Sequence, residues 1–189
     1  MKGRLPLLFV AAGLPALAVA AVQASAPQVA PAEMIRTMGI EPGSWLTHGT
    51  IVDMDVHRTT GDAPLPPELA SRIPLTRGLS RDGRSCVPQG LLPDNALGLP
   101  GIRIGDGCAY PRLEAGGGRI NLRAICGGGP GQARTEFRFD GTYTARSMAG
   151  TLVVDAQIPT DGGYTMHTVL TMSAAHEAGA CTPASPARH

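Results

Sequence analysis

The chain has 189 residues, a length that fits one domain and leaves little room for two. Lys and Arg number 16 against 15 Asp and Glu, a formal net charge of +1, so nothing in the charge favours binding of nucleic acid or of a membrane surface. Hydrophobic residues make up 43% of the chain, while 25 Gly and 17 Pro argue against long helical bundles. The composition favours one globular domain with frequent turns.

The N-terminal stretch has the order of a secretory signal peptide. A basic start is followed by an apolar run over Leu5–Val22, and Ala-x-Ala patterns end at Ala20 and Ala26. Pro27 disfavours cleavage after the second pattern, so residues 1–20 are expected to form the signal peptide. The alternative is a membrane anchor of about 18 residues, near the lower limit for spanning a bilayer. We therefore expect export to the periplasm and a mature protein that is not integral to the membrane.

One helix and one strand are predicted next. Residues 21–38 read as a linker in which Pro31–Met38 forms a short helix, because Pro lies in its first turn and Gly39 follows its end. The domain proper is expected over residues 39–183, with 184–189 as a tail. Its first strand, Ser44–His57, alternates between two faces, with Val52, Met54 and Val56 on one and Asp53, Asp55 and His57 on the other.

The middle of the chain predicts loops. Residues 59–85 and 87–101 are interrupted by Pro and Gly and show no sustained period, apart from one helical turn over 67–70. We therefore expect no strand between the first one and the region that begins near residue 107.

The C-terminal half predicts a series of strands. After a hairpin over 108–126 come strands at 133–140, 142–148, 151–158 and 164–174. The Asp140-Gly141 pair is a hairpin-turn signal. Together the segments predict an all-β antiparallel meander curled into a half-open or closed barrel. The expected core is Trp45, Val52, Met54, Leu122, Phe137, Phe139, Leu152, Val154, Leu170 and Met172.

The four cysteines predict two disulfides, since an even count is typical of an exported chain. Three pairings are open, and spacing favours one. A hairpin with a three-residue loop at Gly116–Gly118 places Cys108 opposite Cys126, which leaves Cys86 for Cys181. The alternative is a zinc site, but the gaps of 22, 18 and 55 residues lack the close spacing that zinc ligands show.

Several short motifs occur in a recognisable order. They are Glu41-Pro42-Gly43-Ser44-Trp45, Cys86-Val87-Pro88, the hairpin between Cys108 and Cys126, Asp140-Gly141-Thr142-Tyr143, and Gly179-Ala180-Cys181-Thr182-Pro183. This order resembles the DUF3617 family of small exported bacterial proteins, a domain of unknown function, over about residues 39–183. The chain departs from the pattern at Leu46, where the family often has Glu, and in a long loop before Cys86. The resemblance implies an exported, β-rich domain with cysteines and implies no activity, so no catalytic residue is carried over.

The function favoured by the sequence is that of an exported, non-catalytic periplasmic protein that binds an apolar ligand or an envelope partner. Met166, Met172, Phe137, Phe139 and Leu170 are candidates to line a cup for such a ligand, although ordinary core packing is favoured for them. No catalytic residue and no cofactor are expected, because no Ser lies in a Gly-x-Ser-x-Gly elbow. An unrecognised hydrolase is the third possible function.

The alternative function is binding of a divalent metal. Asp53, Asp55 and His57 share one strand face and offer carboxylate and imidazole ligands. A site also needs a ligand from elsewhere, for which His48, His167 and His176 are candidates that the sequence does not bring together. The competing interpretation is a solvated outer face, which antiparallel sheets normally have.

Overall fold

The computed structural model describes residues 31–59, 67, 77–87, 97–104, 107–159, 163–179 and 181. The expected signal peptide, its cleavage site and the tail therefore lie outside the described residues, as does the predicted helical turn apart from Pro67. No helix in the described part of the chain is long and apolar enough to cross a membrane.

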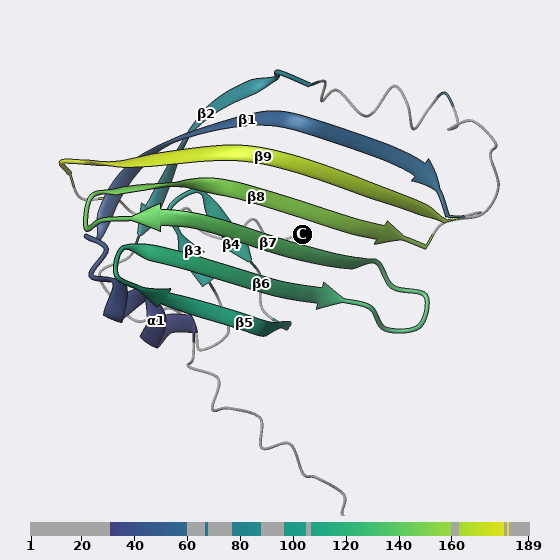
Figure 1. The fold of residues 1–189 in the computed structure, drawn as a ribbon, viewed down its shortest axis with the longest axis horizontal. Helices are drawn as coiled ribbons and strands as arrows, with labels where there is room; N and C mark the ends of the chain where they lie inside the picture. The colour runs from purple at the N-terminus through teal and green to yellow at the C-terminus, as the bar shows by residue number, and fades with distance from the viewer. Residues whose placement is uncertain are drawn as a thin grey trace, which may run out of the picture.

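In the described part of the chain, the fold consists of one short helix, a seven-stranded antiparallel sheet and a separate two-stranded hairpin (Figure 1). Strands β5 to β9 form a meander, and the first strand, β1, pairs with the last, β9. The sheet order is β2-β1-β9-β8-β7-β6-β5, so β2 and β5 are its edges and the sheet is the half-open form of the expected barrel. The elements are α1 Pro31–Met38, β1 Gly43–Arg58, β2 Ser80–Val87, β3 Leu97–Leu99, β4 Ile102–Ile104, β5 Cys108–Gly116, β6 Arg119–Gly127, β7 Arg134–Tyr143, β8 Ser147–Ile158 and β9 Tyr164–Glu177.

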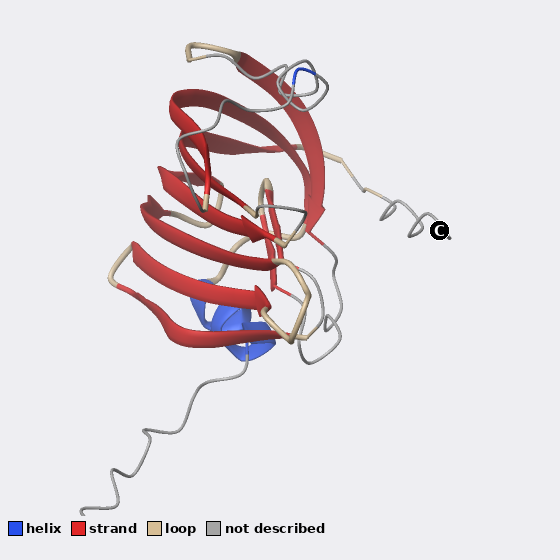
Figure 2. Cartoon of the chain, turned by 90° about the vertical axis from the view of Figure 1, so that its right-hand side faces the viewer, coloured by secondary structure: helices blue, strands red, loops and turns tan. Residues whose placement is uncertain are grey.

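The sheet curls around its apolar face, which α1 and the β3–β4 hairpin cover from the concave side (Figure 2). We call this the inner face and the opposite one the outer face. Trp45, Leu122 and Phe139 are almost completely buried on the inner face. Met34 and Met38 of α1 are also buried there, so the helix, which the sequence assigned to a linker, packs as part of the core.

Most of the expected core is confirmed, but Val52 was predicted wrongly and Met54 does not join the core cluster. Trp45, Leu122, Phe139 and Leu152 are buried, Phe137, Val154, Leu170 and Met172 pack partly buried against them, and Met54 is half-buried. Val52, in contrast, is 45% exposed. The reason is a β-bulge, because Ile51 pairs with Leu170 and Asp53 with the next residue, Val169, which leaves Val52 as the extra residue. Ile51 takes the buried position instead.

The expected turn at Asp140-Gly141 is also wrong. Strand β7 continues to Tyr143, and the chain reverses over Thr144–Arg146, where the Thr144 backbone N–H donates to the carbonyl of Ser147 at 2.8 Å. Gly141 lies inside the strand opposite Gly150, next to the Phe139 ring. Gly141 is therefore needed to leave space for the Phe139 ring and does not form a turn.

Three short strands were missed in the regions expected to be loops. β2 pairs along β1, but its sequence Ser-Arg-Asp-Gly-Arg-Ser-Cys-Val does not alternate, because most of this edge strand is exposed. β3 and β4 form a hairpin whose turn uses Gly101 at a φ of 78°. Buried Leu99, Ile102 and Ile104 hold this hairpin against the core.

Both disulfides are present with the pairing that the sequence favours: Cys86–Cys181 and Cys108–Cys126. Cys108 lies directly opposite Cys126, with 4.3 Å between the Cα atoms. The hairpin turn has two residues, Gly117 and Gly118, both at positive φ, and not the expected three. A bulge between Ala109 and Arg112 shifts the register by one residue and brings the cysteines into line.

Candidate functional site

The three residues predicted to bind metal lie on the outer face of β1 but do not converge. Asp53 turns away: its Oδ1 accepts hydrogen bonds from the Met54 backbone N–H at 2.9 Å and from the guanidinium of Arg77. Asp55 and His57 are brought together, with 3.2 Å between Oδ2 and Nδ1. Only two of the three predicted ligands are thus neighbours.

Of the additional histidines, only His167 joins them. It lies on β9 directly opposite Asp55, and its Nδ1 is 2.7 Å from Oδ1 of Asp155 on β8. His48 pairs with Asp82 nearer the start of β1, and His176 packs against the Trp45 ring.

No three His, Cys, Asp or Glu side chains in the described ranges are placed to hold a metal ion together. The Asp53, Asp55 and His57 set therefore stays a prediction.

An ionic pocket of about 380 Å³ lies on the outer face, where β1, β9, β8 and β7 run side by side. Arg138 donates to Asp155, and Glu136 lies 3.8 Å from both Arg134 and Arg138. Such paired charges orient one another and leave little unbalanced charge for a ligand. The lining residues are His57, Arg134, Glu136, Arg138, Asp155, Ala156, Gln157, Thr165, Met166 and His167.

The charges in and beside this pocket favour the ionised carboxylates. Arg123 donates two hydrogen bonds to Glu136, at 2.8 and 3.0 Å, and these lower the pKa of Glu136 despite its burial. Burial works against ionisation of Asp155, but hydrogen bonds from His167 and Arg138 outweigh it and hold the pKa of Asp155 below its ordinary value. The pocket is thus a network of satisfied ion pairs at neutral pH.

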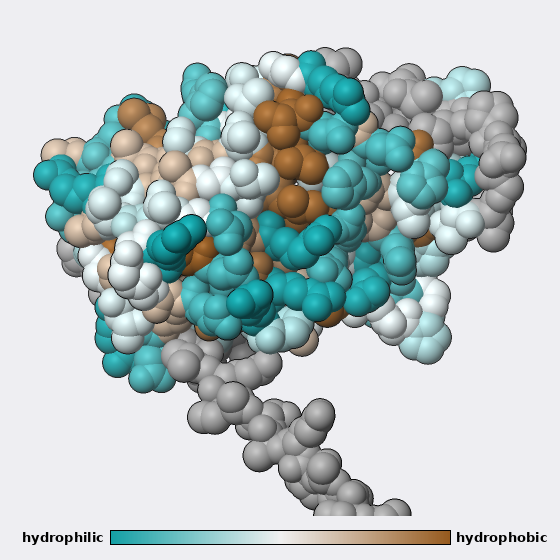
Figure 3. Space-filling model, in the orientation of Figure 1, coloured by the Kyte–Doolittle hydropathy of each residue, from teal (hydrophilic) through white to brown (hydrophobic). Residues whose placement is uncertain are grey.

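A band of apolar surface runs beside these charges. Val153 and Val169 face each other on β8 and β9, and the exposed Val52 lies next to them on β1. Figure 3 shows the band crossing β1, β9 and β8, with hydrophilic surface on its right and surface of intermediate hydropathy on its left. The simple alternation of β1 suggested a uniformly polar outer face, but the outer face also carries this apolar band.

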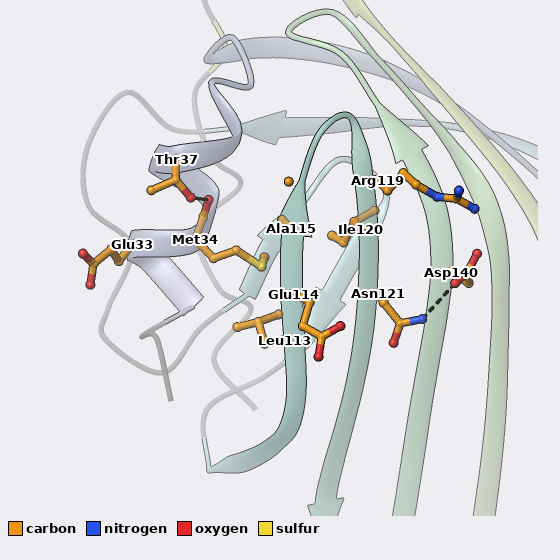
Figure 4. Close-up of a pocket in the computed structure, with 11 residues that line it drawn as sticks. Glu33, Met34, Thr37, Leu113, Glu114, Ala115, Arg119, Ile120, Asn121 and Asp140 are labelled. Carbon is orange, nitrogen blue, oxygen red and sulfur yellow. Dashed lines mark hydrogen bonds between the residues drawn. The ribbon is translucent and has the colours of Figure 1, made fainter. Parts of the chain in front are cut away.

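The sequence did not indicate a larger hollow, of about 690 Å³, where α1 meets the β5–β6 hairpin (Figure 4). We call it the edge cleft, because its lining includes side chains from both faces of edge strand β5. Met34 extends from α1 toward β5. The lining residues are Glu33, Met34, Thr37, Leu113, Glu114, Ala115, Gly116, Arg119, Ile120, Asn121 and Asp140.

The edge cleft combines an apolar part with a polar rim. Its apolar side chains, Met34, Leu113, Ala115 and Ile120, belong to the core or pack against it. Three carboxylates and one guanidinium form the rim, and Asn121 donates to Asp140 at 2.8 Å. No signal in the sequence could have located it, because its formation requires α1, which ends at Met38, to pack on a hairpin that begins at Cys108.

The residues proposed to line an apolar cup do not border this cleft. Phe139 is buried in the core, and Phe137, Leu170 and Met172 pack against it, whereas Met166 is half-buried. Ordinary packing, the favoured interpretation, accounts for all of these side chains except Met166, which lines the ionic pocket.

The fold and the sites define an all-β protein braced by two disulfides, with a helix and a hairpin inside a half-open sheet. No family model, no curated protein and no solved structure matches the chain. The family resemblance therefore remains a prediction.

Proposed function

We propose that this chain is an exported, non-catalytic binding protein of the bacterial periplasm, and that the edge cleft is its ligand-binding site. The two disulfides are compatible with an oxidising compartment, which is where the expected signal peptide would direct the protein. The resemblance to the DUF3617 family agrees with this location and adds no activity.

The observation that carries the proposal is the cleft's size and lining. Its volume of about 690 Å³ falls within the range of roughly 300–1,000 Å³ that small-molecule sites occupy. Such sites are mostly apolar and hold a few polar groups that fix the orientation of the ligand. Met34, Leu113, Ala115 and Ile120 supply the apolar part, and Glu33 and Arg119 are rim charges with no ion-pair partner in the described part of the chain.

The rim indicates the kind of ligand. Glu33, Glu114 and Asp140 outnumber Arg119, so the cleft carries an excess of negative charge. Glu114 already has an ion pair with Arg112 at 3.2 Å, and Asp140 accepts a hydrogen bond from Asn121, which leaves Glu33 as the rim carboxylate without a partner in the described part of the chain. We infer an amphiphile whose apolar part lies on the half-buried Leu113 and Ala115 and whose polar head is neutral or cationic, because an anionic head would be repelled.

Filling the cleft tests the proposal. Gly116 lines it, does not have a positive φ, and a Cβ there would meet no atom within 4 Å, so Gly116→Trp adds bulk without backbone strain. Ala109→Trp is the matched control, since Ala109 is exposed on the same strand and outside the cleft. Binding is measured by native mass spectrometry of the periplasmic protein and by titration with Nile red, an uncharged apolar dye.

We expect the unsubstituted protein and the Ala109→Trp control to retain a bound amphiphile or to bind the dye saturably, and Gly116→Trp to lose this binding at unchanged melting temperature. Equal binding by all three proteins, or no binding by any of them, contradicts the proposal. N-terminal sequencing of the same periplasmic protein checks export separately, with Ala21 expected as the first residue.

A further inference from the structure

Two histidines on neighbouring strands border the ionic pocket. His57 on β1 lies opposite Thr165, and His167 on β9 lies opposite Asp55, so the two imidazoles are diagonal neighbours on the outer face. Diagonal neighbours of an antiparallel pair are about 7–8 Å apart, which long side chains can span. Their side chains are 60% and 39% exposed, so ions in solution can reach both rings.

Each of these imidazoles is held by a carboxylate through the same nitrogen. His57 Nδ1 is 3.2 Å from Asp55 Oδ2, and His167 Nδ1 is 2.7 Å from Asp155 Oδ1. A carboxylate accepts the hydrogen bond, so it favours the tautomer with the proton on Nδ1 and leaves the lone pair on Nε2. This is the way in which proteins commonly orient a histidine that binds a metal.

The free Nε2 distinguishes this pair from the other histidines in the described ranges. His48 also has a carboxylate at Nδ1, namely Asp82, but its Nε2 is 3.3 Å from the hydroxyl of Thr50. His176 uses its Nε2 in a hydrogen bond to the Pro42 carbonyl at 3.1 Å. Among the histidines that the structure describes, only His57 and His167 thus combine an oriented ring with an Nε2 that has no partner in the described residues.

We propose that the Nε2 atoms of His57 and His167 bind a divalent transition-metal ion, in the order of preference copper, then nickel or zinc. Imidazole nitrogen suits these ions, and copper binds most tightly to a given set of nitrogen ligands. Asp55 and Asp155 orient the rings and do not bind the ion, since Asp155 is also engaged by Arg138. Water completes the coordination, so the ion exchanges readily.

This site differs from the one expected from the sequence. Asp53 takes no part in the proposed site because its carboxylate is engaged by Arg77, and the second ligand is His167, 110 residues from His57 in the chain. The inference stands on the outer face and does not depend on the edge cleft or on its ligand.

The test is a titration of the mature, untagged protein with Cu²⁺. Calorimetry measures the affinity, and electron paramagnetic resonance of the bound ion reports its nitrogen ligands. His57→Gln and His167→Gln each remove one nitrogen ligand, while His48→Gln removes a histidine that is also paired with a carboxylate. We expect the parent protein and His48→Gln to bind one ion with two imidazole nitrogens. We expect each of the other two variants to bind at least tenfold more weakly and to show one nitrogen.

A fourth variant, Asp155→Asn, tests orientation while leaving both imidazoles in place. Loss of a carboxylate that orients a metal-binding histidine typically weakens metal binding by about 10–100-fold, and we expect such a loss for this variant. The proposal is overturned if Cu²⁺ does not bind, if His48→Gln weakens binding as much as His57→Gln does, or if binding survives in the His57→Gln/His167→Gln double variant.

Discussion

Gly141 and Gly150 face each other across β7 and β8, and a Cβ built on either would lie 2.8 Å from Cζ of Phe139. The two glycines leave space for the ring, which is 1% exposed and lies in the centre of the inner face. The absence of a Cβ at both glycines thus allows the Phe139 ring to pack against the backbone of β7 and β8.

Gly150→Ala is expected to destabilise the fold by about 1–3 kcal/mol, the usual cost of overpacking a core. Its added methyl group meets the Phe139 ring and neighbouring backbone that cannot move aside. Gly116→Ala, where a Cβ meets nothing within 4 Å, is the control and is expected to cost little. Urea unfolding measures both.

The partner of this clash can be identified with a second variant. If the ring is responsible, the cost of Gly150→Ala should fall in a Phe139→Leu background, because leucine lacks the Cζ atom. An unchanged cost in that background would contradict the assigned packing role and point to the backbone of β7.

The bulge in β1 makes opposite predictions for two adjacent apolar residues. Ile51 is 5% exposed and Val52 is 45% exposed. Ile51→Ala should cost about 2–5 kcal/mol, the range for a buried large-to-small change, whereas Val52→Ala should stay within about 0.5 kcal/mol, as surface changes do. Comparable losses for the two variants in urea unfolding would show that β1 has no bulge.

Strand β1 shows what sequence patterns can and cannot determine. Alternation correctly predicts that Asp55 and His57 share the outer face and that Met54 faces inward. A single alternation cannot place both Trp45 and Met54 inside, since their positions differ by an odd number. The bulge at Val52 resolves this conflict, but no local residue preference marks it.

Local residue patterns are also insufficient to predict the details of the cysteine hairpin and the positions of the candidate sites. The expected facing of Cys108 and Cys126 is present, although a two-residue turn and a bulge produce it in place of a three-residue loop. The Asp55–His167 relationship requires the first strand to pair with the last, and the edge cleft requires α1 to reach β5. Both are long-range contacts, which local patterns do not encode.

The two disulfides should differ in their contribution to stability. Cys108–Cys126 spans 18 residues and Cys86–Cys181 spans 95. In the chain-entropy model such loops correspond to about 3 and about 4.7 kcal/mol. Replacing each pair by serine and measuring urea unfolding checks the order, with the larger loss expected for Cys86→Ser/Cys181→Ser. The reverse order would mean that loop entropy does not govern these bridges.

The ion pair between Arg123 and Glu136 should make stability depend on pH in one direction. Hydrogen bonds from Arg123 lower the pKa of Glu136, so the folded state favours the carboxylate more than the unfolded state does. The stabilisation is therefore complete at pH values above the unfolded pKa of Glu136 and is lost as the pH falls through the lower, folded pKa.

Glu136→Gln isolates this contribution. The variant should be less stable than the parent protein in urea at pH 7, because the charged acceptor of Arg123 is gone. The difference should shrink as the pH falls toward about 3, where a glutamate of ordinary pKa is protonated in the unfolded chain. A difference between Glu136→Gln and the parent that stays constant from pH 7 to 3 would mean that the side-chain shape, and not the charge of Glu136, stabilises this part of the sheet.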